Sequence, residues 1–326
     1  MLFSHPFTLT HCSQTRCLQL ARSFGYSQFD LNCGCPSIES NAPYGAALMK
    51  RPSHVAALVD HMAHALHGEA PVSVKCRIGV LDSIDGRVAP AEDYASFADF
   101  VEQVTASGAC RRVVVHARTA VLRGFSPADN REVPPLRYDF VTKLASDFPH
   151  LHIVLNGGIG SRHDFESVKN SGTRLAGVMA GRWCLRNPFD LLQLRENPLN
   201  PESIIDAYTA YAISELKLVS RDEAADLLSP IALVFMSIDR QINAALVDDS
   251  ECMDDDALEE LYSLSWKIIE GSIPLLTALD CQTHKIDIRD KISGSPPLRP
   301  FRQILGSVCG KKLMSKMKKN TIERIK

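Results

Sequence analysis

The feature that most constrains the fold is an alternation of short β-branched strands and amphipathic helices between residue 26 and about residue 195. Each apolar stretch is four to six residues long, which is typical of a strand buried in a parallel sheet. The expected strands cover residues 28–31, 72–77, 112–116, 152–156 and 177–180, and the expected helices cover 53–66, 91–106, 138–147, 162–169 and 188–195. This region therefore predicts a parallel α/β domain.

Parallel α/β repeats form either an open doubly wound sheet or a closed (β/α)8 barrel. A doubly wound dinucleotide fold carries a Gly-x-Gly-x-x-Gly loop after its first strand, and this chain has none there. Polar residues instead follow several successive strands, as they do at the mouth of a barrel. We therefore expect a (β/α)8 TIM-type barrel.

The pattern changes at about residue 200, where strands give way to helical periodicity. The expected helices cover residues 201–218, 221–247 and 254–279. We predict two domains, a catalytic barrel over 1–198 and an all-helical domain over 199–326.

Charge is distributed unevenly, although the net charge is only -2. Residues 248–260 contain eight acidic side chains, whereas residues 311–326 contain seven Lys or Arg and one acid. A basic end of this kind suits a nucleic-acid backbone, and a solvated terminal helix is the alternative.

Composition favours an intracellular globular protein with 45% hydrophobic residues. No apolar run reaches the 18 residues of a membrane helix, and there is no signal-peptide pattern. The ten cysteines lack zinc-type spacing, so we read them as reduced thiols and expect no metal site. We expect a cytoplasmic protein, with a chloroplast or mitochondrion as the alternative because residues 1–29 contain no acid. The oligomeric state stays open.

A Gly-Cys-Pro turn follows the first expected strand. Gly34 permits a tight bend and Pro36 fixes the backbone after the thiol, so the side chain of Cys35 is held in place. An enzyme could mount a proton donor or a nucleophile in this way. The alternative is a structural cysteine in a tight turn.

Two basic pairs stand at the ends of later strands. Lys75 and Arg77 are two residues apart, as are His116 and Arg118, so each pair shares one face of its strand. The two strands would be neighbours in a barrel, which predicts a basic mouth suited to an anionic cofactor. A solvated strand end is the alternative for either pair.

Glycine-rich turns follow the last two expected strands. Asn156, Gly157 and Gly158 end one strand, and Gly181 and Arg182 end the next. Backbone N–H groups at such glycines can approach a phosphate closely, and barrels often bind phosphate after their last two strands. We expect these two loops to hold a phosphate group.

These blocks together resemble the tRNA-dihydrouridine synthase family, in particular its bacterial DusA-type branch. They appear in the family's order and spacing, over residues 31–37, 44–49, 74–79, 115–118, 130–136, 156–158 and 181–182. The resemblance implies an FMN-binding barrel followed by a helical tRNA-binding domain, which agrees with the pattern of the chain.

The resemblance also implies a reaction. In this family FMN, reduced by NADPH, passes a hydride to C6 of a uracil ring, and the cysteine of the Gly-Cys-Pro turn, here Cys35, protonates C5. A thiol with a pKa of about 8.5 is mostly protonated near neutrality, the form that an acid needs. Cofactor contacts are implied for Lys75 and His116 with the flavin and for Asn156, Gly157, Gly158, Gly181 and Arg182 with its phosphate.

The substrate implied is a uridine in the D-loop of tRNA, at position 20 or 20a, flipped out of the RNA to enter the pocket. Asn32 and Arg131 match family positions that touch the tRNA or its target uridine, and Arg118 is expected at the same pocket. Lys316 lies in the matching basic helix of the C-terminal domain. One position departs from the pattern, because Ala128 stands where the family has a basic residue.

The front of the family's barrel has no counterpart here. A Pro-Met loop and a Gln-Leu-Gly-Gly strand end are missing, although residues 5–9 could be a remnant of the third strand. We therefore expect at most six of the eight units, a barrel lacking its first strands. Such a sheet has unpaired edges, which dimerisation could cover.

Two other functions compete with an FMN-dependent uridine reductase. One is a noncatalytic tRNA-binding remnant or truncated isoform that has lost flavin binding. The other is a flavin barrel acting on a small molecule, such as a dihydroorotate-type dehydrogenase, against which residues 130–136 and the basic end argue.

Overall fold

The computed structural model describes the residues 2–3, 11–36, 44–83, 93–186 and 200–215, together with the single residues 191, 194, 230, 231, 234, 235, 238, 264 and 268. The chain divides into two compact units, Met1–Ala180 and Gly181–Lys326, which are described separately. The helices predicted over 221–247 and 254–279 fall almost wholly outside the described residues, as does Lys316.

Six parallel strands form the main sheet of the first unit. They are β1 (Leu2–Phe3), β2 (Phe29–Cys33), β3 (Val72–Arg77), β5 (Cys110–His116), β7 (His152–Asn156) and β8 (Gly177–Met179). Their order in space is β1-β2-β3-β5-β7-β8, the same as their order in the chain. The predicted α/β class with a parallel sheet is therefore confirmed.

The strand order also separates the two architectures that the sequence allowed. A doubly wound sheet reverses its strand order at a switch point, whereas here each strand is added beside the one before it. This is the winding of a barrel, with β1 and β8 at the two edges of the described sheet. Closure into a (β/α)8 barrel stays a prediction.

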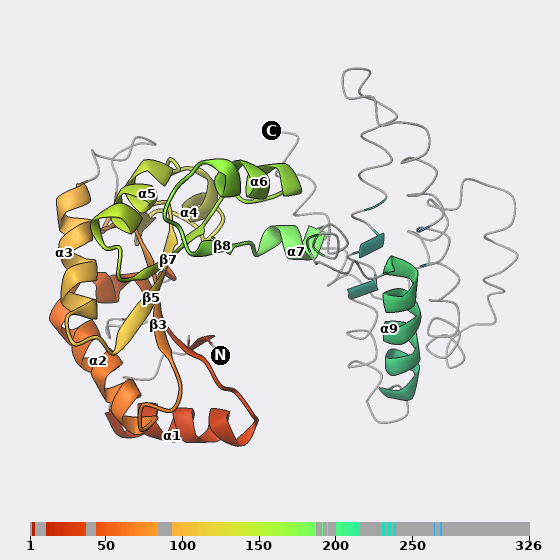
Figure 1. Cartoon of the computed structure of the whole chain (residues 1–326), viewed down its shortest axis with the longest axis horizontal. Helices are drawn as coiled ribbons and strands as arrows, with labels where there is room; N and C mark the ends of the chain where they lie inside the picture. The colour runs from red at the N-terminus through yellow and green to blue at the C-terminus, as the bar shows by residue number, and fades with distance from the viewer. Residues whose placement is uncertain are drawn as a thin grey trace, which may run out of the picture. The chain divides into compact units, whose positions relative to one another are not determined.

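Helices connect the strands of this sheet. They are α1 (His11–Ser23), α2 (Pro52–Ala65), α3 (Tyr94–Thr105), α5 (Tyr138–Asp147) and α6 (Arg162–Asn170). Local signals set their starts, because α2 has proline in its first turn, and Asp93 caps α3 by accepting a hydrogen bond from Ala95 N at 2.9 Å. Helices α1, α2 and α3 follow one another along the outer side of the strands (Figure 1).

Short elements lie near the strand ends: the 3-10 helix η1 (Gly45–Lys50), helix α4 (Asp129–Glu132), and a second sheet of β4 (Val80–Leu81) and β6 (Ala120–Val121). The second unit contains α7 (Arg182–Arg186) and α9 (Pro201–Glu215). Among the described residues, no helix has both the length and the apolar character needed to cross a bilayer.

The two faces of the main sheet differ in chemistry. The face toward the helices is apolar, and nine of its side chains are at most 1% exposed: Phe29, Leu31, Cys33, Val74, Cys76, Val113, Val115, Ile153 and Leu155. Strand alternation places Asn32, Lys75, Arg77, His116 and Asn156 on the opposite face. The apolar face fixes the register of the strands, so it also fixes which polar residues lie side by side.

Most predicted elements are confirmed to within two or three residues. The strands at 72–77 and 152–156 and the helix at 138–147 match in full. The first strand was predicted to end at residue 31, but β2 continues to Cys33, so Asn32 belongs to the strand. The helix predicted at 188–195 lies mostly outside the described residues, because only residues 191 and 194 of that range are described, and it stays a prediction.

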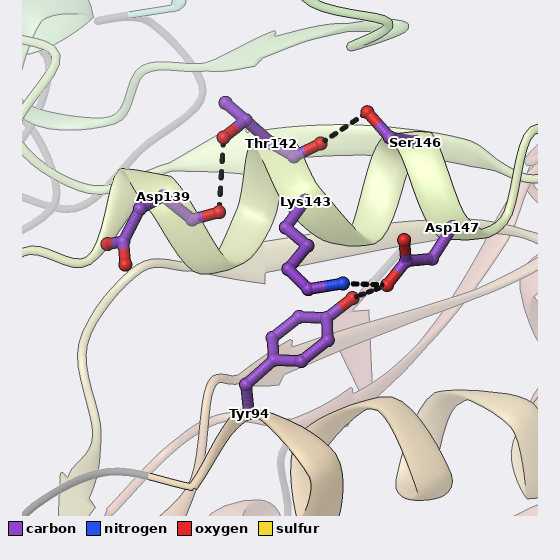
Figure 2. Close-up of polar contacts among 6 residues, drawn as sticks. All are labelled: Tyr94, Asp139, Thr142, Lys143, Ser146 and Asp147. Atoms are coloured by element: carbon purple, nitrogen blue, oxygen red, sulfur yellow. Dashed lines mark hydrogen bonds and ion pairs between the residues drawn. The ribbon is translucent and has the colours of Figure 1, made fainter.

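Helices α3 and α5 contact each other through Tyr94. Figure 2 shows its hydroxyl donating to Asp147 Oδ2 at 2.5 Å, while Lys143 Nζ lies 2.6 Å from the same oxygen. The Tyr94 ring also lies edge-on to Phe140, with centroids 5.4 Å apart, and beneath the Lys143 ammonium. Hydrogen bonds from Lys143 and Tyr94 lower the pKa of Asp147, which keeps the carboxylate ionised.

We expect the Tyr94 ring, rather than its hydroxyl, to hold these helices together. Tyr94→Ala should lower the free energy of unfolding by about 1–2 kcal/mol, because it removes a partly buried aromatic contact. Tyr94→Phe keeps the ring and loses one exposed hydrogen bond, so its effect should be much smaller. Urea denaturation of both variants measures the difference, and equal losses would contradict this view.

Candidate active site

The candidate site is built where four neighbouring strands end. In the parallel register, Asn32 is the partner of Lys75, Arg77 is the partner of His116, and His116 is the partner of Asn156. These five side chains point to the same face of the sheet. The predicted juxtaposition of the two basic pairs is confirmed for Lys75, Arg77 and His116.

The thiol turn, residues 34–36, is held by hydrogen bonds on both of its sides. Asn32 Oδ1 accepts from the backbone N of Gly34 at 3.0 Å and of Cys35 at 3.3 Å, and the carbonyl of Cys35 accepts from Ala46 N at 2.7 Å. Cys35 itself is half-buried. The predicted fixed presentation of this thiol therefore has a physical basis, in which Asn32 positions the turn.

Gly45 allows η1 to lie directly against this turn. Its φ is +59°, and a Cβ added to it would lie 2.3 Å from the carbonyl oxygen of Cys35. A larger residue would therefore push the thiol turn away. Gly45 belongs to the block 44–49 that resembles the family, but nothing in the sequence pattern indicated this close approach.

Arg77 reaches from β3 to two other segments. Its Nε donates to the carbonyl of Gly34 at 3.2 Å and its Nη1 to the carbonyl of Asn130 at 2.9 Å, and the residue is only 5% exposed. Burial and then the neighbouring Arg118 lower the pKa of Arg77 to about 10, so the guanidinium stays charged at neutral pH.

Asn130 fixes α4 beside β6. It is fully buried, and its side chain accepts from Val121 N at 2.7 Å and donates to Val121 O at 2.9 Å. The next residue, Arg131, is exposed. Asn130 thus holds a predicted substrate residue in place, a role that sequence reasoning missed.

Arg118 lies two residues beyond the end of β5, which ends at His116 as expected, so strand alternation does not place Arg118 on the face of His116. Its Nη1 donates to the carbonyls of Glu132, at 3.3 Å, and Pro134. It therefore helps to hold the segment that follows α4.

Lys75 adds a second partly desolvated cation to this face. Burial, followed by repulsion from Arg77, lowers its pKa, while Asp30 acts in the opposite direction. The Asp30 carboxyl has a raised pKa, mainly because it is buried, and it accepts a hydrogen bond from Ser73 Oγ at 2.7 Å. A partly buried cation at the strand ends favours an anionic ligand.

Two side-chain hydrogen bonds hold the end of β7 and the glycine loop that follows it. Tyr138 Oη donates to the carbonyl of Gly157 at 2.7 Å, and Asn156 Nδ2 donates to the carbonyl of Met179 at 2.7 Å. Gly157 and Gly158 have φ values of +101° and +78°, and a Cβ on Gly158 would lie 2.4 Å from the Tyr138 hydroxyl. Only glycine fits this loop.

Gly181 and Arg182 belong to the second compact unit, so their position relative to Gly157 stays a prediction. The same holds for Lys316, which lies outside the described residues.

Three further cysteines lie on the strands of this sheet. Cys33, Cys76 and Cys110 are fully buried, and burial raises the pKa of all three, to about 12 for Cys76 and about 11 for Cys110. Such thiols stay protonated and unreactive. Of the cysteines near these strand ends, Cys35 is the one placed to meet a ligand.

Comparison with known proteins shows one matching family. A family model described as Dihydrouridine synthase (Dus) matches residues 10–221. Relatives named tRNA-dihydrouridine(20/20a) synthase include one from Xanthomonas axonopodis pv. citri, 44% identical over 203 residues, which are 60% of this chain and 57% of the relative.

Further relatives of the same name give the same picture. The Pseudomonas putida protein is 40% identical over 221 residues, 68% of this chain and 58% of the relative. The Pseudomonas aeruginosa protein is 46% identical over 175 residues, 53% of this chain and 48% of the relative. The chain thus spans about half the length of these relatives.

Among solved structures, a monomeric dihydrodipicolinate synthase variant aligns over 93% of this chain and 94% of the variant's chain. The TM-score is 0.35 and the identity 13%, so the match supports no conclusion about fold or function.

We expect Gly45→Ala to displace the thiol turn. The added methyl group would overlap the carbonyl of Cys35, so the alkylation rate of Cys35 by iodoacetamide, followed by peptide mass spectrometry, should change several-fold. Gly25→Ala is the matched control, since Gly25 also has a positive φ but no atom within 4 Å of an added Cβ. Identical Cys35 reactivity in the two variants would refute the proposed role of Gly45.

Proposed function

The chain belongs to the dihydrouridine synthase family, and on that basis we propose that it reduces uridine to 5,6-dihydrouridine in tRNA, with FMN as its cofactor and NADPH as reductant. The observation that carries this proposal is the Cys35 turn, held rigidly beside a row of basic side chains at the ends of parallel strands. The names of the relatives support uridine 20 or 20a as the target.

The residues present fit an anionic flavin. Lys75 and His116 stand at neighbouring strand ends, and the backbone at Gly157 and Gly158 is fixed in a conformation that can expose N–H groups to a phosphate. We assign the flavin contacts to Lys75 and His116, and the phosphate contacts to Asn156, Gly157, Gly158, Gly181 and Arg182. Bound FMN would supply the hydride that C6 of the uracil receives.

Cys35 would complete the reduction by donating its proton to C5. The C5=C6 double bond then becomes a single bond, because C6 has gained a hydride and C5 a proton. The thiolate left on Cys35 recovers a proton from solvent. Lys75 and Arg77 lie close enough to interact electrostatically with Cys35, which places two cations beside the reacting ring.

The RNA would meet the site through residues around this turn. Asn32 uses its Oδ1 to hold the turn, so its Nδ2 group is the part available to a uracil carbonyl. Arg131 is exposed on α4 and suits a phosphate or the target nucleotide. We assign further contacts to Arg118 and, in the helical domain, to Lys316.

Cys35→Ala tests the assigned acid. Dihydrouridine formation should fall by about 100-fold or more, because general acid catalysis contributes that much, while reduction of the flavin by NADPH continues. The measurement is mass spectrometry of a tRNA transcript after reaction, with Cys17→Ala as a control at an exposed cysteine on α1. Undiminished dihydrouridine in the Cys35 variant would rule out this role.

The same assay separates the competing function. Wild-type protein that binds tRNA in a salt-dependent manner but never forms dihydrouridine would be the noncatalytic binding protein.

Gly158→Ala should weaken FMN binding, because the new methyl group would strike Tyr138 and Leu136 and shift the loop. Gly172→Ala is the control, as Gly172 shares a positive φ but has no atom within 4 Å of an added Cβ. Titration of each variant with FMN, followed by flavin fluorescence, gives the affinities. Equal affinities would contradict the assignment of this loop.

A further inference from the structure

We infer that Arg77 is a positioning residue that couples the thiol turn to the α4 segment, defined as residues 126–134, so that a movement of this segment is transmitted to Cys35. The inference rests on the proposed function, and it assigns a positioning role within the same site.

The side chain of Arg77 bridges the two segments that carry the functional residues Cys35 and Arg131, and we call its two hydrogen bonds the strut. Arg77 Nε holds the carbonyl of Gly34, which directly precedes Cys35, and Nη1 holds the carbonyl of Asn130, which directly precedes Arg131. One side chain from β3 thus joins the proposed acid to the proposed RNA contact.

Both ends of the strut are firmly attached. At one end, Asn32 accepts hydrogen bonds from the backbone N–H groups of Gly34 and Cys35. At the other end, the side chain of Asn130 is hydrogen-bonded to both the N–H and the carbonyl of Val121. The two partners of Arg77 are main-chain groups, so neither can swing away as a side chain could. A shift of the α4 segment would therefore move the thiol turn.

Burial makes the strut hard to replace by water. Arg77 is 5% exposed and Asn130 is fully buried. Removing the guanidinium would leave two carbonyl groups in a buried setting without this donor, which destabilises both loops.

The shape of arginine matters here more than its charge. Both hydrogen bonds go to carbonyls rather than to carboxylates, and the charges near Arg77 include Arg118 and Arg131, which repel it. A planar guanidinium presents Nε and Nη1 in a fixed fork, whereas a lysine has one flexible ammonium group. Arg77→Lys keeps the charge but cannot reproduce this bridge.

Hydrogen exchange measured by mass spectrometry on the full chain tests the coupling without relying on activity. In Arg77→Gln, peptides covering 29–36 and 126–134 should both exchange faster, by about tenfold. Arg118→Gln is the matched control, because Arg118 holds the carbonyls of Glu132 and Pro134 but not that of Gly34. It should speed exchange in 126–134 alone.

Kinetic measurements on Arg77→Lys distinguish the two hydrogen bonds of Arg77 from its charge, because this variant keeps the charge and loses the bridge. In Arg77→Lys, the rate of uridine reduction at saturating tRNA should fall about tenfold, with KM for tRNA changed less than about threefold. NADPH-driven reduction of bound FMN should stay near wild type.

Two results would overturn the inference: unchanged exchange of 29–36 in Arg77→Gln, or full turnover in Arg77→Lys. If Arg77→Gln unfolds, every strand exchanges faster, and the exchange of residues 29–36 is then measured in Arg77→Lys instead. Unchanged exchange of 29–36 in that variant would overturn the inference. If wild-type protein makes no dihydrouridine, the proposed function fails while the exchange data still decide the coupling.

Discussion

The in-register parallel pairing of β2, β3, β5 and β7 is the constraint on which the site depends. The register is fixed by the apolar face toward the helices, where side chains such as Leu31, Val74 and Val115 are almost fully buried. A slip of one residue would exchange the two faces and bury Lys75 among the helices. The same burial that stabilises the sheet therefore places the basic residues together at its strand ends.

A second layer of contacts turns this row of residues into a site. Hydrogen bonds between side chains and main-chain groups hold the loops at the strand ends, and they come from Arg77, Asn130 and Tyr138. Without them, these loops would be held by local contacts alone. Glycines at 45 and 158 let these loops approach their neighbours closely. The proposed acid and the proposed phosphate loop are thus held by residues that need not touch a ligand.

The sequence predicted the strands and their neighbours well, because β-branched strands and the spacing of Lys75, Arg77 and His116 are local patterns. It did not predict the role of Arg77, whose hydrogen-bond partners lie 43 and 53 residues away in the chain. It also did not predict the need for glycine at 45, which depends on how closely η1 approaches the turn. The two strands of the small second sheet are two residues each, too short for periodicity to reveal.

The proposed function requires that these strand ends hold FMN beside Cys35. The most direct test is the absorbance spectrum of the purified full chain, before and after addition of FMN and removal of the excess. We expect the protein to show a flavin spectrum and to release FMN when it is denatured. Well-folded protein that stays colourless after incubation with FMN would contradict it.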